Sequence, residues 1–442
     1  MKSRQLLLAP ILAAFCLLTT HAGADKDAGH YWAQWRGPLS TGVSPHANPP
    51  IEWSESRNIR WKLSLPGMGH STPIIWGDRV YVTSAVPYGD SVDPVRTHAP
   101  GAHDYVAPTQ RHKFMLLAIN RADGKIVWER TLREELPHEG SHNTGSLASN
   151  SPVTDGEHLI VFFGSRGLYC LDMDGDLQWE TDLGDMESLH AHGEGSSPAL
   201  YRDTLIVNWD HEGQSFVVAF DKRTGEQRWK VARDEVSSWS TPLVVEHGGK
   251  AQVIISATKR VRGYDLATGD VIWECAGLSS NVVASPVAAD GMVYAGSSYD
   301  FQAMLAIRLD GAKGDITGTQ SVVWTLDRLT PYVPSPLLYG QTLYFIRHNQ
   351  AMLSCLNAKT GQTRIGPFRL GGIRNVFASP VGAADRIYIT DRSGTTLVLS
   401  HAATPEFLAL NRLDDSFSAS PALVDGEIYL RGQRYLYCIA EE

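Results

Sequence analysis

The sequence predicts an all-β fold, a β-propeller of eight blades with four antiparallel strands in each blade. The first support is a repeat of Ser-Pro or Thr-Pro pairs. After the first interval, their prolines lie 46, 44, 44, 50, 44 and 41 residues apart. Spacings of roughly 40–50 residues are typical of four-stranded propeller blades. The eight prolines are Pro73, Pro152, Pro198, Pro242, Pro286, Pro336, Pro380 and Pro421.

The second support is the pattern inside one repeat, which is clearest in residues 196–229. Two β-rich runs, 204–208 (TLIVN) and 216–220 (FVVAF), are bounded by Asp, Gly and Thr-Gly turn signals. The unit ends at Trp229. Such short strands separated by tight turns fit one propeller blade.

The third support is that the two ends of the chain complement each other. The repeat that starts at Pro421 runs out after residues 435–439 (YLYCI), one strand short of four. Residues 60–63 (RWKL), around Trp61, resemble a closing strand whose own repeat is missing. Pairing the two segments would close the ring and leave few exposed sheet edges.

Taken in order, the chain begins with a segment typical of a secretory signal peptide, residues 1–24. Two basic residues precede an apolar run over 6–18, and residues 22–24 (AGA) provide a small-residue cleavage site. Cys16 follows a bulky residue, which disfavours lipid attachment. No later run approaches the roughly 20 apolar residues of a spanning helix. We therefore expect a periplasmic or secreted protein without a transmembrane segment.

Residues 25–58 are rich in Trp, Pro and Gly, show no period, and are expected to pack along the outside of the ring. The propeller is assigned to residues 59–442. The long first interval of the repeat is explained by an insert over 86–112, in which no strand or helix period is visible. A loop of this length is typical of a lid or an interaction surface.

Two repeat positions are assigned to the architecture. Tryptophans close most blades, with Arg364 and Leu408 expected in their place in blades six and seven. The closing tryptophans are Trp128, Trp179, Trp229, Trp273 and Trp324. A second position alternates between alanine and cysteine, as a small buried position would. Its members are Ala118, Cys170, Ala219, Ala306, Cys355 and Cys438. These thiols and Cys275 are therefore expected to be free, although an exported protein can also form disulfides.

The repeated pattern of Ala or Cys, Asp, Thr-Gly and Trp resembles the quinoprotein-type, or PQQ-like, eight-bladed propellers. It is nearly intact in residues 217–229 (VVAFDKRTGEQRW) and 263–273 (GYDLATGDVIW), and the resemblance covers about residues 59–442. Residues 32–38 (WAQWRGP) are also similar to a group of exported bacterial propellers of this type. The family includes pyrroloquinoline-quinone (PQQ) dehydrogenases and non-enzymatic propellers such as the outer-membrane assembly scaffold. The resemblance therefore implies a fold and leaves the function open.

In such a ring, the loops that lead to each Ser/Thr-Pro pair surround one end of the central funnel. Polar and aromatic side chains in these loops are therefore the candidate ligand-binding residues. They are His138, His142, Asn143, His190, His192, Glu194, Trp239, Asn281, Tyr332, Arg374 and Asn375.

His190, His192 and Glu194 form the sharpest local pattern. In an extended segment, alternate side chains share one side. Two imidazoles and a carboxylate would then suit zinc or another divalent ion, completed by His138 or His142. The same residues also fit a polar ligand site without a metal, or a solvated rim. The sequence leaves these three interpretations open.

The resemblance also implies what a quinone dehydrogenase would need: an aromatic floor for PQQ, calcium ligands and an Asp base. Trp239 or Tyr332 could serve as the floor, and Asp414 or Asp415 as the base. The vicinal Cys-Cys pair of the alcohol-oxidising branch is absent. We therefore expect a binding or scaffold module without PQQ catalysis. An oxidoreductase that depends on PQQ with calcium, or on a divalent metal, is the alternative.

The formal net charge of −9 at pH 7 argues against nucleic acid or an anionic membrane surface as the main partner. The expected partners are an envelope or extracellular protein, or a small ligand in the funnel. The chain is expected to be a monomer.

Overall fold

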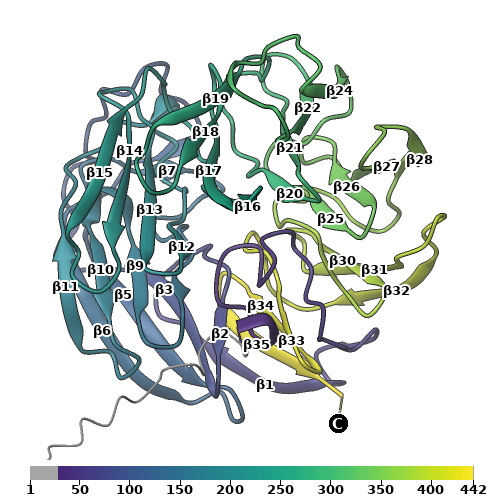
Figure 1. Ribbon diagram of the computed structural model, residues 1–442. Helices are drawn as coiled ribbons and strands as arrows, with labels where there is room; N and C mark the ends of the chain where they lie inside the picture. The colour runs from purple at the N-terminus through teal and green to yellow at the C-terminus, as the bar shows by residue number, and fades with distance from the viewer. Residues whose placement is uncertain (1–27, 442) are drawn as a thin grey trace, which may run out of the picture.

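The computed structural model describes residues 28–441, which form a ring of β-sheets (Figure 1). Eight sheets surround the centre, and the three helices are single 3-10 turns. These turns are η1 (Ala28–His30), η2 (Gly164–Arg166) and η3 (Leu189–Ala191). The predicted all-β propeller of eight four-stranded blades is confirmed. The segment assigned to a signal peptide, residues 1–24, lies outside the described residues.

Within residues 28–441, no helix is long and apolar enough to cross a membrane.

Each blade is a sheet of antiparallel strands that begins at the centre and ends at the outer edge of the ring. From inside to outside, blades one to four contain β2 (Ile74–Trp76), β3 (Arg79–Tyr88), β5 (Arg111–Asn120) and β6 (Ile126–Glu135); β8 (Val153–Thr154), β9 (Leu159–Phe162), β10 (Leu168–Leu171) and β11 (Leu177–Thr181); β12 (Ala199–Tyr201), β13 (Thr204–Trp209), β14 (Phe216–Asp221) and β15 (Gln227–Ala232); and β16 (Leu243–His247), β17 (Lys250–Ser256), β18 (Val261–Asp265) and β19 (Val271–Cys275).

Blades five to eight contain, in the same order, β20 (Val287–Ala289), β21 (Met292–Ser297), β22 (Ala303–Arg308) and β24 (Val322–Leu326); β25 (Leu337–Tyr339), β26 (Thr342–Ile346), β27 (Met352–Asn357) and β28 (Thr363–Arg369); β29 (Val381–Ala383), β30 (Arg386–Thr390), β31 (Thr395–Ser400) and β32 (Phe407–Arg412); and β33 (Ala422–Val424), β34 (Glu427–Arg431), β35 (Tyr435–Ala440) and β1 (Ile59–Ser64). In addition, β23 (Gly314–Asp315) pairs in parallel with β19, and β4 (Tyr105–Val106) pairs with β7 (Ser141–His142).

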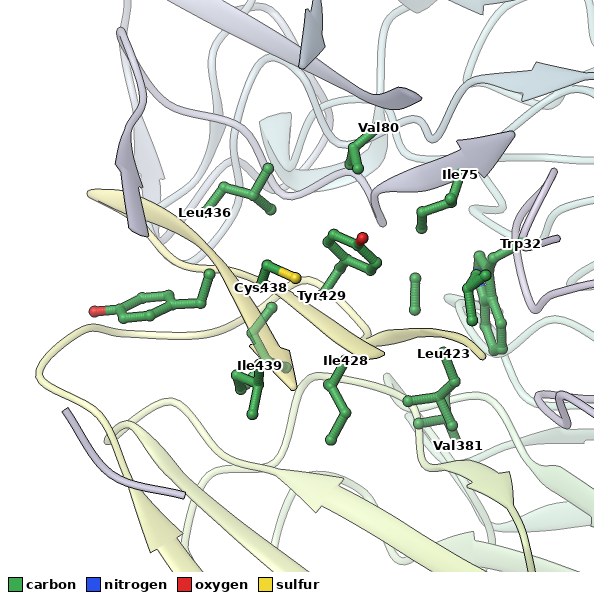
Figure 2. Packing of buried hydrophobic residues seen from close by; sticks show 14 of the residues in the cluster. Trp32, Ile75, Val80, Val381, Leu423, Ile428, Tyr429, Leu436, Cys438 and Ile439 are labelled. Atoms are coloured by element: carbon green, nitrogen blue, oxygen red, sulfur yellow. The ribbon is translucent and has the colours of Figure 1, made fainter. Parts of the chain in front are cut away.

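The strand around Trp61 closes the ring, as predicted. β1 runs antiparallel to β35 and places Trp61 opposite Cys438, so purple and yellow ribbons meet in one sheet (Figure 1). Figure 2 shows the buried core at this junction, where Trp32 lies beside Ile75 and Leu423. The first and the last long strands of the described chain therefore lie side by side in one blade.

The Ser/Thr-Pro pairs form a girdle of hydrogen bonds around the channel. In seven of the eight steps, the backbone N–H of the Ser or Thr in one blade donates to the hydroxyl oxygen of its counterpart in the next, at 2.9–3.0 Å. The following Pro has no N–H to leave unpaired at the inner edge of the blade. The girdle residues are Thr72, Ser151, Ser197, Thr241, Ser285, Ser335, Ser379 and Ser420.

The step from the last blade to the first is made by a different contact. Arg431 of β34 donates from Nη1 to the hydroxyl of Ser71 (2.7 Å) and to the carbonyl oxygen of Thr83. The hydroxyl of Thr72 has no hydrogen-bond partner among the described residues. A buried guanidinium therefore spans the point where the two ends of the chain meet.

The closing tryptophan of one blade is held by the next blade. Nε1 of Trp61, Trp179, Trp229 and Trp324 donates to a backbone carbonyl in the following blade at 2.8–2.9 Å. A turn glycine of that following blade covers the ring, and a Cβ added to Gly225 would lie 2.7 Å from Trp179. The recurring Gly and Trp are therefore inter-blade contacts, as expected for architectural residues.

In its own sheet, each closing residue lies opposite the small Ala/Cys position, and this corrects two assignments. Ile365 pairs with Cys355 in blade six, and Ala409 pairs with Val398 in blade seven, where Arg364 and Leu408 were expected. The bulge beside this position also occurs in blades one to five, so it does not set these two blades apart. The spacing from Ala219 to Trp229 equals that from Cys355 to Ile365, whereas the turn of blade seven is one residue longer.

The thiols of Cys170, Cys275, Cys355 and Cys438 are buried and unpaired within residues 28–441. Burial raises the pKa of each, to about 12 for Cys170 and Cys355. The prediction of free core cysteines is confirmed.

Residues 31–48 lie along the inner strands, which differs from the expected place on the outside of the ring. The carbonyl oxygens of Trp32, Ala33 and Thr41 accept N–H bonds from β2, β8 and β25, at 2.9–3.1 Å. Gly42 and Ser44 bond to Gly382 of β29. The inner strand of a blade is a sheet edge with free backbone groups. This segment satisfies those groups in blades on both sides of the ring, and it therefore crosses the channel.

We expect the girdle to contribute measurably to stability. Ser335→Ala should lower the free energy of unfolding by about 1–3 kcal/mol, because the buried N–H of Ser285 loses its acceptor. Ser335→Thr should restore most of the loss, since the hydroxyl of Thr241 accepts the equivalent N–H bond in blade four. Urea unfolding measures both. The exposed Ser91→Ala is the control, and an equal effect of both alanine variants would contradict this role.

Candidate functional site

A blind cavity of about 420 Å³ occupies the funnel. Its floor is formed by six girdle residues and by Trp35, whose Nε1 donates to the Ser285 hydroxyl (3.3 Å). Trp35 also lines a separate crevice between the N-terminal segment and blades three to five. The crossing segment therefore separates the funnel from the other end of the channel.

The walls of the funnel are mostly aromatic rings and imidazoles. They belong to His70, His103, His142, His192, Trp239, Tyr299, Tyr332, His348 and Phe377. Tyr332 stacks on His348 with ring centroids 4.5 Å apart, and Tyr299 lies on the other side of Tyr332 at 5.9 Å. Flat faces of this kind suit a ring-shaped ligand.

The structure brings together five of the residues that the sequence singled out. His142, His192, Glu194, Trp239 and Tyr332 all line the cavity. Trp239 is oriented by a hydrogen bond from its Nε1 to the carbonyl oxygen of Gly193 (2.6 Å).

The other candidates lie outside the cavity. His138 donates from Nε2 to the carbonyl oxygen of Met186 (2.8 Å), and Asn281 is buried close to Tyr332. Asn143, Arg374 and Asn375 are exposed. His190 lies at the rim, with its ring centroid 5.2 Å from that of His192.

Sequence reasoning missed several lining residues. His70 stands two residues before the girdle residue Thr72, so the loop rule that found the others would also have found it. Trp35 and His103 lie in segments without any period. Their place at the funnel depends on how those segments cross the ring.

Four histidines gather where the insert meets the rim. The ring of His103, from the insert, lies 4.5 Å from His190 and 5.0 Å from His192, and His142 lies 4.5 Å from His192. We call these four residues the histidine cluster. It joins the insert to the loops before blades two and three.

Backbone hydrogen bonds fasten the insert over this rim. The N–H of His190 donates to the carbonyl oxygen of Pro100 (3.0 Å), and that of Asn143 donates to Asp104 (2.7 Å). β4 pairs with β7, which ends at His142. The ends of the insert, 86–88 and 111–112, continue β3 and β5, although no strand period was visible there. The loop over 89–110 is therefore a cover carried by an extended hairpin.

The ligand set His190, His192 and Glu194 is not assembled, which corrects the metal interpretation. The segment is a turn in which His190 has a φ of 63°, so the alternation of an extended strand does not apply. Glu194 accepts hydrogen bonds from Ser165 and Arg166. Within residues 28–441, no group of three or more His, Cys, Asp or Glu side chains could hold a metal ion.

The cavity contains little net charge of its own. Glu194 is its only carboxylate among the described residues, and Arg166 neutralises it at 2.9 Å. Burial lowers the pKa of His70 to about 3 and of His192 to about 4, and it also lowers the pKa of His142 and His348. At neutral pH these imidazoles are uncharged, so they act as flat polar surfaces.

A family model described as outer membrane protein assembly factor BamB (PQQ_2) matches residues 93–213 and 213–442. None of the curated proteins compared with the sequence matches it.

Solved structures share the fold at low identity. BamB from Moraxella catarrhalis is 13% identical with a TM-score of 0.51, covering 80% of this chain and 99% of its own. The computationally designed Ika8 protein is 11% identical with a TM-score of 0.52, covering 79% and 100%. The quinohemoprotein alcohol dehydrogenase ADHIIG from Pseudomonas putida HK5 is 11% identical with a TM-score of 0.54, covering 94% and 81%. At these identities, the likeness shows the fold alone.

We expect the insert to loosen in acid. His142 and His192 are held neutral, mainly by burial, and release of the insert returns their pKa values toward about 6.5. The stability of the closed form is therefore complete above about pH 6.5 and is lost as the pH falls toward about 4. Protection of the amides of residues 92–110 from hydrogen exchange, corrected for intrinsic rates, should fall roughly tenfold between about pH 7 and pH 5.

β17, the second strand of blade four, serves as the internal reference for that measurement. The double variant His142→Gln with His192→Gln should show little pH dependence, because neither glutamine titrates. Equal corrected rates at both pH values in the unmodified protein would show that these rings do not hold the insert.

Proposed function

We propose that this chain, which belongs to the family described as outer membrane protein assembly factor BamB, is a non-catalytic binding module. The module would take a small ligand into its funnel. The likeness to BamB and to a quinohemoprotein dehydrogenase fits either a scaffold or an enzyme. The proposal therefore depends on the funnel itself.

The observation that carries the proposal is the blind cavity of about 420 Å³. Ligand sites are typically concave, several hundred Å³ in volume, and mostly apolar with a few placed polar groups. This funnel combines four aromatic side chains in its wall with hydroxyl groups at its floor. Trp35 lies at its floor, between this cavity and the crevice on the other side of the crossing segment.

The insert supports the same proposal. It contributes His103 to the wall and is fastened to the rim by the histidine cluster and a few backbone bonds. Long loops over a pocket commonly act as lids. A ligand would then enter when the insert opens, and the outer face of the insert would be open to a protein partner.

PQQ chemistry does not fit the donor set of the funnel. Calcium takes six to eight oxygen ligands, usually including several carboxylates. Among the residues that the structure describes, Glu194 is the only carboxylate that lines the cavity, and it already accepts hydrogen bonds from Ser165 and Arg166. Of the two bases named from the sequence, Asp414 is exposed and paired with Arg434, and Asp415 bonds to the backbone of residues 434–435. We therefore derive no catalytic step.

Export is part of the proposal and is supported by the signal-peptide pattern of residues 1–24. In the periplasm or the medium, a monomeric propeller of this kind would meet envelope or extracellular proteins as well as small solutes.

Reconstitution tests the oxidoreductase alternative. Mixing the purified protein with PQQ and calcium should give no dye reduction with alcohols or sugars, because the described lining of the funnel lacks the several carboxylates that a calcium site takes. A quinoprotein dehydrogenase of known activity serves as the positive control. Dye reduction that is lost on addition of a calcium chelator would favour the oxidoreductase instead.

Fragment binding tests the binding function. We expect ligand-observed NMR with a library of one- and two-ring compounds to find binders whose affinity falls at least tenfold in Phe377→Ala, a change in the funnel wall. Phe407→Ala, an exposed residue on the outer strand β32, should have no effect. A library without any binder that depends on Phe377 would overturn the proposal.

A further inference from the structure

We propose that the funnel selects an anionic ligand, a single carboxylate carried on a flat ring, with the carboxylate at the Ser/Thr girdle. This inference rests on the proposed binding function and adds the chemical class of the ligand. Two independent features of the funnel carry it: hydroxyl donors that have no acceptor, and buried guanidinium groups that have no counter-charge.

The girdle presents a ring of unused donors. Six of its members line the cavity: Ser197, Thr241, Ser285, Ser335, Ser379 and Ser420. Each hydroxyl oxygen already accepts a backbone N–H from the preceding blade. None of these hydroxyls donates to an acceptor among the described residues. The oxygen is therefore engaged and the proton is free, so the ring offers donors to whatever lies above it.

One imidazole extends this donor set, and a second leaves a buried nitrogen unpaired beside it. Nδ1 of His142 accepts the N–H of Thr144 (3.1 Å), so the neutral ring carries its proton on Nε2. Nε2 of His70 is buried without a partner among residues 28–441. An unpaired buried polar atom is costly, and a ligand that pairs with it removes that cost.

Three arginines around the funnel lack a carboxylate partner. Arg36 lies beneath Trp35, with its guanidinium 5.9 Å from the ring centroid, and bonds only to carbonyl oxygens. Arg431 bonds to Ser71 and Thr83, and Arg392 lies against Phe377 at 5.1 Å. None of them takes part in an ion pair within the part of the chain that the structure describes. Arg36 and Arg431 are buried and Arg392 is half-buried. A charge that is removed from water without a partner is unfavourable, and an anion nearby would offset it.

The electrostatic effect of these arginines reaches the cavity. The charges of Arg431 and Arg392 help to lower the pKa of His70, after the larger effect of burial, and Arg392 also lowers that of His142. Burial lowers the pKa of Arg36 and Arg431 to about 9, so both remain charged at neutral pH. The base of the funnel is therefore positive in a chain whose net charge is −9.

The same geometry limits the charge of the ligand. No Lys or Arg within residues 28–441 lines the cavity, so the guanidinium groups act from behind the lining residues. A single carboxylate can be satisfied by hydroxyl and imidazole donors in this field. A dianion would remain undercompensated, because its second charge would meet no cation directly.

The ring that carries the carboxylate would lie between the aromatic walls. An aromatic acid presents this flat ring directly, and a uronic acid offers the apolar face of a puckered sugar ring in its place. The experiment compares 2-naphthoate with 2-naphthamide, and glucuronate with glucose, by isothermal titration calorimetry at neutral pH. Each pair keeps the ring and removes the charge.

We expect the preferred acid to bind at least tenfold more tightly than its neutral partner. In Arg392→Gln this preference should fall to less than threefold, because the change removes a nearby charge that has no hydrogen-bond partner to lose. The matched control is Arg364→Gln, an exposed arginine on the outer strand β28, which should keep the full preference.

The outcomes separate this inference from the proposed function. Equal binding of acid and amide, with both lost in Phe377→Ala, would overturn the anion inference and leave the binding function intact. A preference for the acid that is unchanged in Arg392→Gln would also overturn it. The carboxylate would then be recognised without the positive charge that Arg392 contributes to the funnel. Absence of binding by all four compounds at millimolar concentration would count against the anion inference, while the fragment screen decides the binding function.

Discussion

The hydrogen bond from the N–H of one Ser or Thr to the hydroxyl of its counterpart in the next blade is the contact on which the ring depends. It is local, buried and repeated around the channel, so it sets the distance between neighbouring inner strands. At the outer edge of the ring, the bond from a closing Trp to the next blade sets the distance between neighbouring outer strands in the same way. Between these two contacts, each blade packs only against its neighbours, and strand β1 then closes the ring.

The N-terminal segment crosses the channel of the ring and divides it into two hollows. Its backbone pairs with inner strands on both sides of the channel, and Trp35 becomes a floor between two separate hollows. Arg36 is drawn in with it and bonds to the carbonyl oxygens of Pro336 and Pro380. A buried cation placed in this way stabilises the crossing and also makes the floor positive. The closing contact of Arg431 has the same double effect.

The insert and the funnel are linked through imidazoles. His142 and His192 belong to the loops before blades two and three, and His103 comes from the insert. All three line the cavity, and the ring of His192 lies 5.0 Å from that of His103 and 4.5 Å from that of His142. The state of these rings therefore affects both the closure of the insert and the polarity of the wall. A fall in pH and the binding of a ligand are therefore both expected to change how tightly the insert is held on the funnel.

The sequence by itself determined the propeller, its eight blades and its closing strand, because each depends on local patterns that repeat. It also identified His142, His192, Glu194, Trp239 and Tyr332, since each lies in a loop whose place follows from the repeat. Only the tertiary structure decided what those residues do. Glu194 turned out to be bound to Arg166, and His190 lies in a turn that no strand period reveals. Trp35 and His103 reach the funnel through segments without a period, where long-range contacts with other blades determine the path of the chain.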